Sequence, residues 1–154
     1  MSDSAALSVV VFRIGDLVCA LPAARVREVL PRLGVTRIPG VAGAIEGLAN
    51  VRGGLLSVAD GHALLGRPAR PDDEGAVLVV ESAGRRYGLD VSQVIDFVEL
   101  PPDAIAPREE LPGVDPALVE AVAVHPGGSF ILIDLDTLLA PFTGGNPEPL
   151  GGGR

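Results

Sequence analysis

The sequence predicts an all-β protein built from two similar barrels of about five strands each, with short helices. Three observations predict this class. The chain has 154 residues, of which 20 are Gly and 14 are Pro, and a chain that turns this often is expected to hold short strands rather than long helices. Its apolar runs, such as SVVVF, AVLVV and FILID, have strand length. The sequence also contains a copy of itself.

The internal repeat becomes visible when the chain is aligned with itself. At an offset of 74 no gap is needed, and the matched positions are Glu46 and Glu120, Ala49 and Ala123, Gly53-Gly54 and Gly127-Gly128, Asp60 and Asp134, and Leu64-Leu65 and Leu138-Leu139. Upstream, a fainter match at an offset of 68 pairs Leu21 with Leu89, Val26 with Val94 and Val29 with Phe97. A single barrel of roughly 60 residues is marginal alone, so we expect the two units to pack together.

We expect residues 1–154 to form one domain of two subdomains. The first lies at about residues 15–71 and the second at about 76–142, and the strand at 7–14 could be shared between them. The tail at 143–154, TGGNPEPLGGGR, has nothing to bury and is expected to be disordered.

Each unit is expected to begin with a hairpin and a short helical turn. SVVVFRI and LVCALP flank a Gly-Asp turn in the first unit, and AVLVVES and RRYGLD flank an Ala-Gly turn in the second. Pro22 suits a first helical position and Ser92 suits a cap. The extended segments VREVL and VIDFVEL follow.

Each unit then continues with a proline-rich crossing and a second hairpin. PRLGVTRIPGVAG and PPDAIAPREELPGVDP hold too much Pro and Gly to be regular. LANV and LLSVAD form the closing hairpin of the first unit, and VEAVAV and SFILID form that of the second. Asp60 and Asp134 stand where each last strand meets a brief helix, so we expect them to cap these helices.

The charge pattern disfavours several partner classes. The net charge is -8 and every basic residue is Arg. Residues 1–71 hold eight Arg against five acids, whereas residues 72–136 hold three Arg against fourteen acids. Phosphate binding needs a concentrated basic face, so we expect no nucleic-acid partner. A basic first barrel and an acidic second barrel would favour head-to-tail contacts between molecules.

Membrane insertion and disulfides are not expected either. The apolar runs are shorter than the roughly 18 residues that a spanning helix needs, and MSDSAALS lacks the basic start of a secretory signal. We therefore expect a cytoplasmic protein. The lone Cys19 lies among apolar neighbours in LVCALP and is expected to be a small buried side chain.

Arg52 is the residue that the repeat does not explain. Gly53 and Gly54 are matched by glycines in the second unit, so we expect them to make a tight turn that needs positive φ. The residue before the pair is Arg52 in the first unit but Pro126 in the second. The turn is thus made without an arginine, and an exposed guanidinium at a hairpin tip is suited to anchoring a protein interface.

The run TRIPGVAGAIEGLANVRGGLLSVADGHALLG resembles the signature of CheW-type chemosensory coupling proteins. VVVFRIGDLVCALPAARVREVL, GLDVSQVIDFVELPPDAIAP and FILIDLDTLL extend the likeness over nearly the whole chain. The resemblance implies two SH3-like five-stranded barrels and no catalysis. The chain departs from the family pattern at Ser57, Gly61 and Ser92.

The resemblance also implies partners and site residues. Family members link the cytoplasmic tip of methyl-accepting chemoreceptors to the regulatory domain of the histidine kinase CheA. By matching residues, Arg52, Asn50 and Gly47 would meet the receptor, and Val26 and Glu28 would meet the kinase. No catalytic residue, cofactor or metal site is expected.

Three other functions stay open. The chain could be a CheW-like scaffold for another output, such as pili or gliding, or a generic β-barrel module that binds unrelated proteins. As a rival of another class, Asp60 and Asp134 could pair as in aspartic proteases. However, ADGHA and IDLDT lack the hydroxyl residue and Gly that follow each Asp in such a site. His62 and His125 show no catalytic partner in the sequence.

Overall fold

The computed structural model describes residues 6–36, 45–107, 111, 113–126 and 128–143. Its strands are β1 (Leu7–Ile14), β2 (Leu17–Pro22), β3 (Val26–Pro31), β4 (Ile45–Val51), β5 (Gly54–Asp60), β6 (Ala76–Ser82), β7 (Arg85–Val91), β8 (Gln93–Leu100), β9 (Ile105–Pro107), β10 (Val119–His125) and β11 (Gly128–Ile133). Its helices are short: α1 (Gly61–Leu64), α2 (Leu135–Leu138), α3 (Ala140–Thr143), and the 3₁₀ turns η1 (Ala23–Arg25), η2 (Pro102–Ala104) and η3 (Pro116–Leu118). The prediction of an all-β protein with short helices is confirmed.

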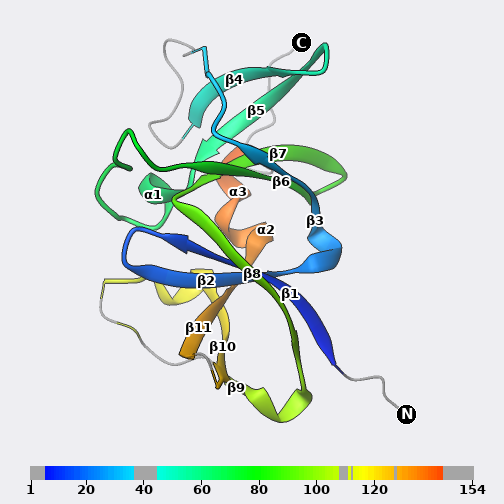
Figure 1. Ribbon diagram of the computed structural model, residues 1–154, viewed down its shortest axis with the longest axis vertical. Coiled ribbons are helices and arrows are strands. Elements are labelled where there is room, and N and C mark those ends of the chain that lie inside the picture. The colour runs from blue at the N-terminus through cyan, green and yellow to red at the C-terminus, as the bar shows by residue number, and fades with distance from the viewer. Residues whose placement is uncertain (1–5, 37–44, 108–110, 112, 127, 144–154) are drawn as a thin grey trace.

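The strands form two sheets, which lie one above the other in Figure 1. The order in the first is β8-β1-β2-β11-β10-β9, and the order in the second is β3-β6-β7-β5-β4. The first sheet has six strands rather than the predicted five. The difference arises because β9, inside the proline-rich crossing, pairs with β10 through Ala121 and Pro107.

Continuous apolar runs form strands that are buried on both faces, as β1 and β6 show. In β1, Val9 and Val11 point into a cluster within the six-stranded sheet, whereas Val10 and Phe12 join the larger core between the sheets. In β6, all four residues from Val77 to Val80 are buried. A strand buried on both faces needs apolar side chains at consecutive positions, which explains why these runs lack the usual alternation.

The sheets do not follow the two halves of the chain. The hairpin β1–β2 pairs with β8 and β11 of the second half, and the hairpin β6–β7 pairs with β3 and β5 of the first half. Strand pairing therefore crosses the expected ranges 15–71 and 76–142, because β2 and the pair β6–β7 each lie in the sheet built mainly from the other range. The expected tail lies outside the described residues beyond Thr143.

This exchange also changes the expected distribution of charge. Arg85 and Arg86 come from the acidic half of the chain, but they lie in the same sheet as Arg27. These two arginines add positive charge to the sheet that also holds β3, β4 and β5 of the first half. The contrast between a basic first barrel and an acidic second barrel stays a prediction.

The β-bulges of the strands also occur at equivalent positions in the two units. In β3 the register shifts between Val26 and Glu28, and in β8 it shifts opposite Val11 and Phe12, which leaves Ile95 as the extra residue. β4 and β10 have equivalent bulges at Glu46 and Glu120. A bulge bends a strand and increases its twist, so both sheets bend at matching places.

The two helical turns that the sequence suggested differ from each other. A 3₁₀ turn does follow Pro22, which is its N-cap rather than its first helical residue. No turn of helix follows Ser92, whose hydroxyl instead accepts a hydrogen bond from the backbone N–H of Gly15 at 3.0 Å. Tertiary contact has here replaced the local capping role.

Candidate functional site

The candidate site is built around the two-residue turn between β4 and β5. Val51 pairs with Gly54, so Arg52 and Gly53 are the central residues. Both have positive φ, 51° at Arg52 and 85° at Gly53, as a type I′ turn requires. Gly54 has no such φ and already belongs to β5, so the expectation that both glycines supply positive φ was wrong for Gly54.

Asn50 and Gly47 shape this hairpin from within. The side-chain oxygen of Asn50 accepts a hydrogen bond from the backbone N–H of Gly53 at 3.1 Å, which secures the turn. Gly47 is buried, and a Cβ atom there would lie 2.1 Å from the carbonyl oxygen of Thr36. Thr36 and Leu48 exchange two backbone hydrogen bonds beside it. Gly47 therefore permits a close approach of two backbones and offers no side chain to a partner.

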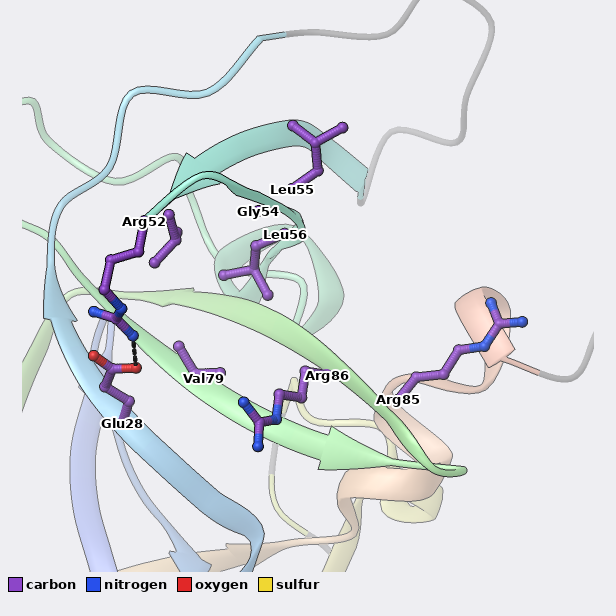
Figure 2. Close-up of a pocket in the computed structure, with 9 residues that line it drawn as sticks. Glu28, Arg52, Gly54, Leu55, Leu56, Val79, Arg85 and Arg86 are labelled. Carbon is purple, nitrogen blue, oxygen red and sulfur yellow. Dashed lines mark hydrogen bonds and ion pairs between the residues drawn. The ribbon is translucent and has the colours of Figure 1, made fainter.

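Arg52 and Glu28, which the sequence assigned to separate surfaces, are in contact. One terminal nitrogen of Arg52 donates to a Glu28 carboxylate oxygen at 2.5 Å, and Figure 2 shows the two side chains pointing at each other from the hairpin and from β3. This contact lowers the pKa of Glu28 and raises that of Arg52. The Arg52 side chain is still 67% exposed, so the pair lies at the surface.

The ion pair stands at one end of a groove of about 590 Å³, which we name the Arg52 groove. Apolar side chains line its floor and arginines stand along its rim (Figure 2). The lining residues are Glu28, Val51, Arg52, Gly54, Leu55, Leu56, Val79, Arg85 and Arg86. Leu55 beside it is 72% exposed, so the groove offers apolar contact area as well as charge.

Val26 occupies a different position from the other candidates. It is half-buried on β3 and packs against the main core cluster. It does not line the Arg52 groove. The structure therefore brings Arg52 and Asn50 of the β4–β5 hairpin together with Glu28 of β3, the strand at the other end of the sheet order, and leaves Val26 on the inner side of β3.

The model of the CheW-like domain family matches residues 8–141. This chain belongs to the CheW-like domain family. Among curated proteins, it is 37% identical over 108 residues to "Protein PilI" of Pseudomonas aeruginosa. That match spans 70% of this chain and 60% of the other, which is less than two thirds of PilI. It is also 26% identical over 131 residues to "Chemotaxis protein CheW" of Rhizobium meliloti, covering 84% of each.

A solved CheW structure has the same fold. The crystal structure of the scaffolding protein TtCheW from Thermoanaerobacter tengcongensis superposes with a TM-score of 0.82 at 27% identity. The match covers 94% of this chain and 99% of that one. The CheW-like resemblance and the two SH3-like subdomains are thereby confirmed. Among the described residues, none of the helices is both long and apolar enough to cross a membrane.

The two aspartates at the strand ends of this CheW-like fold cap helices. Asp60 accepts from the backbone N–H groups of His62 and Ala63 at 3.0 and 3.3 Å, and Asp134 accepts from that of Thr137 at 3.1 Å. Each carboxylate is thus engaged by its own helix, α1 or α2.

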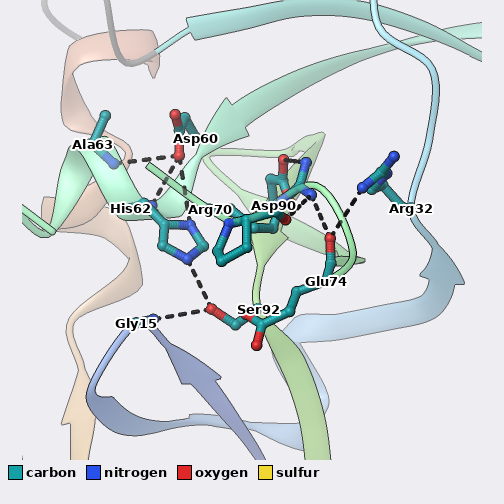
Figure 3. A network of polar contacts seen from close by, with 10 residues as sticks. Gly15, Arg32, Asp60, His62, Ala63, Arg70, Glu74, Asp90 and Ser92 are labelled. Carbon is teal, nitrogen blue, oxygen red and sulfur yellow. Dashed lines mark hydrogen bonds and ion pairs between the residues drawn. The ribbon is translucent and has the colours of Figure 1, made fainter. Parts of the chain in front are cut away.

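A buried polar cluster lies behind the hairpin, between the two sheets (Figure 3). Arg70 donates to both carboxylate oxygens of Asp90, at 3.1 and 3.2 Å. His62 is buried, its Nε2 lies 2.8 Å from the Ser92 hydroxyl, and its Nδ1 lies 3.7 Å from Asp60. Burial lowers the pKa of His62. The departure from the family pattern at Ser92 thus serves an internal contact.

Arg85 and Arg86 are the charged groove residues that sequence reasoning missed. The signal was present in the repeat, because the offset of 68 places them on Leu17 and Val18. Two arginines in one copy against two aliphatic residues in the other mark a difference that the barrel does not require.

Proposed function

We propose that this chain couples the cytoplasmic tip of chemoreceptors to the regulatory domain of a CheA-type histidine kinase, without catalysis of its own. The observation that supports this most is the Arg52–Glu28 pair, which is exposed and held by a rigid turn. An exposed ion pair contributes little to folding. Its charges are therefore available to a partner, and a guanidinium fork on a rigid element suits a protein interface.

Under this proposal Arg52, with Asn50 securing its turn, meets the receptor, and Glu28 meets the kinase domain. The 2.5 Å contact links the two surfaces. A partner that takes up either charge also frees the other one, because both side chains must leave the same ion pair. The adaptor would then hold receptor and kinase at adjacent positions, with Val26 supporting β3 from behind.

Binding of purified receptor-tip and kinase-domain fragments tests this proposal. We expect Arg52→Glu to weaken receptor binding about tenfold or more, because it replaces an attraction with repulsion from Glu28 and the partner. We expect Glu28→Lys to weaken kinase-domain binding similarly. If Arg52→Glu leaves receptor binding unchanged, the receptor role of the turn is wrong, and unchanged kinase binding by Glu28→Lys removes the second surface.

The charge swap Arg52→Glu with Glu28→Arg is the matched control for folding. It keeps an opposite-charge pair at the same two positions, so we expect a melting temperature near that of the unmodified chain. If the swap binds both fragments normally, the ion pair itself matters and the individual charges do not.

A second candidate is a CheW-like scaffold for another output, such as pili. It is supported by the 37% identity to a relative named PilI. Co-purification of the native complex separates the two candidates, since the receptor and kinase that come with the chain identify the system it serves.

A further inference from the structure

The molecule has a second groove that the repeat makes equivalent to the Arg52 groove. We name it the Phe130 groove; it holds about 310 Å³ and is lined by Val11, Val18, Ile95, Asp96, Val98, His125, Gly128, Ser129 and Phe130. Offsets of 68 and 74 superimpose the two linings. The matched positions are Glu28 and Asp96, Val51 and His125, Val79 and Val11, Arg86 and Val18, Gly54 and Gly128, Leu55 and Ser129, and Leu56 and Phe130.

The two equivalent grooves differ in charge. The Arg52 groove carries three arginines and one glutamate, whereas the Phe130 groove carries Asp96 and no arginine. The lining of the Arg52 groove thus sums to +2 on a chain whose net charge is -8. All of this difference comes from Arg52, Arg85 and Arg86, whose counterparts are Pro126, Leu17 and Val18.

The arginines of β7 are not needed by the barrel. Both lie exposed at the start of the strand. Within the described part of the chain no ion pair is found for Arg85, and Arg86 lies 3.6 Å from Glu81, which already holds Arg27 at 2.6 Å. The equivalent strand β2 begins with Leu17 and Val18 and forms the same parallel contact with its neighbour. The cationic rim is therefore an addition to a scaffold that folds without it.

We propose that Arg85 and Arg86 make the Arg52 groove selective for a protein partner that inserts an aliphatic side chain flanked by carboxylates. This inference rests on the proposed function and specifies the chemistry of the partner. The buried Leu56 and Val79 form an apolar floor, and Leu55 extends it outward. Figure 2 shows Arg86 on the side of this floor opposite Glu28, and Arg85 farther along the strand with its guanidinium directed away from the floor. Carboxylates on either side of the inserted group would meet these guanidiniums.

Binding of the kinase regulatory domain at two salt concentrations tests whether Arg85 and Arg86 attract carboxylates of the partner. The variant Arg85→Leu with Arg86→Val installs the residues that the chain uses in its other barrel, so we expect it to fold. At 50 mM NaCl we expect its affinity to fall about 5- to 20-fold, and at 500 mM NaCl less than about twofold, because salt screens rim charges. Arg86→Val alone is compared with Arg32→Val, which removes one arginine outside the groove and is expected to change nothing.

Unchanged or tighter binding by the double variant overturns the proposal. An equal loss of affinity at both salt concentrations also overturns it, because the substitutions would then have removed packing rather than charge. An equal effect of Arg32→Val would also overturn it, since the effect would then belong to net charge.

A second probe does not depend on the kinase. Two acetylated, amidated pentapeptides, Glu-Glu-Leu-Glu-Glu and Lys-Lys-Leu-Lys-Lys, are titrated into the labelled protein while amide NMR shifts are followed. We expect only the acidic peptide to move the resonances of Leu55, Leu56 and Arg86, and the double variant to abolish this. Absence of shifts with the acidic peptide, or equal shifts with both, overturns the inference. Failure to bind any kinase or receptor fragment, with the peptide result intact, would contradict the proposed function alone.

Discussion

Glu46 shows how a single carboxyl group is perturbed by its place in the fold. It is the extra residue of the bulge in β4, half-buried, and it faces Asp90 on β7, Asp60 on β5 and Arg70 from the connector. Burial and the hydrogen bond to Asp90 raise the pKa of Glu46 to about 8. Arg70 is already held by both oxygens of Asp90, so it cannot fully neutralise a second carboxylate.

The raised pKa of Glu46 predicts a loss of stability at alkaline pH. The folded chain keeps the Glu46 proton up to about pH 8, whereas the unfolded chain releases it near the usual value of 4.5. The folded state therefore binds more protons between these values, and the free energy of unfolding falls as pH rises through this window. Glu46→Gln is neutral at every pH and can still donate to Asp90.

We expect Glu46→Gln to melt about 2–4 °C higher than the unmodified chain at pH 8.5, which corresponds to roughly 1 kcal/mol for a chain of this size. At pH 4 the two should melt together. Thermal unfolding followed by circular dichroism between pH 4 and pH 9 measures this. Glu120→Gln is the control, because Glu120 occupies the equivalent bulge of β10 but is exposed. Parallel pH profiles for Glu46→Gln and the unmodified chain would contradict the assignment.

Residue-level inference from sequence succeeds where the contact is local. The capping contacts of Asp60 and Asp134 reach no further than three residues along the chain, so strand and helix patterns suffice to suggest them. Gly47 is different: its reason lies in Thr36, eleven positions away and on a separate segment. Arg52 is different again, because its contact with Glu28 depends on how β3 lies beside the hairpin. Neither of these two contacts can be predicted from the residues that are close by in the sequence.

At the scale of the element, the β4–β5 hairpin combines two demands at one residue. Type I′ turns prefer Asn-Gly or Gly-Gly at their central positions, yet this turn has Arg52 at φ 51°. A side chain in the left-handed region costs about 1 kcal/mol. The hairpin therefore gives up some stability to place a guanidinium at its tip.

The variant Arg52→Gly separates the turn from the charge. Glycine relieves the backbone cost, but it adds flexibility to the unfolded chain and removes the exposed ion pair. We expect these effects to cancel to within about 1 kcal/mol in the free energy of unfolding, while receptor-tip binding is lost. Urea denaturation and pull-down with the receptor fragment measure the two effects.

The control for this variant is Gly53→Ala, which forces a side chain to φ 85°. It leaves Arg52 in place and is expected to destabilise the hairpin by about 1–2 kcal/mol. If Arg52→Gly instead unfolds the chain, Arg52 belongs to the fold and its availability to a partner is disproved.

At the scale of the whole molecule, the repeat predicted the kind and order of most elements, but not the extra strand β9 and not the partners of each strand. Self-alignment matches β1 with β6, β3 with β8 and β4 with β10, and the structure shows equivalent bulges in the last two pairs. It cannot say whether a hairpin pairs within its own repeat or with the other one. Both arrangements bury the same apolar faces, so the hydrophobic pattern is identical for the two.

The exchanged hairpins predict that neither half of the chain folds alone. Without residues 72–154, β3 loses β6 and β5 loses β7, so that only the isolated hairpins β1–β2 and β4–β5 keep a strand partner. Isolated hairpins are marginally stable in water. We expect fragments 1–71 and 72–154 to give poorly dispersed amide NMR spectra when separate. Mixed in equal amounts, they should recover the dispersion of the intact chain, because each supplies the hairpin that the other sheet lacks. A well-dispersed spectrum from fragment 1–71 alone would show that its strands can close a barrel among themselves, and the exchange would then not be what holds the two sheets together.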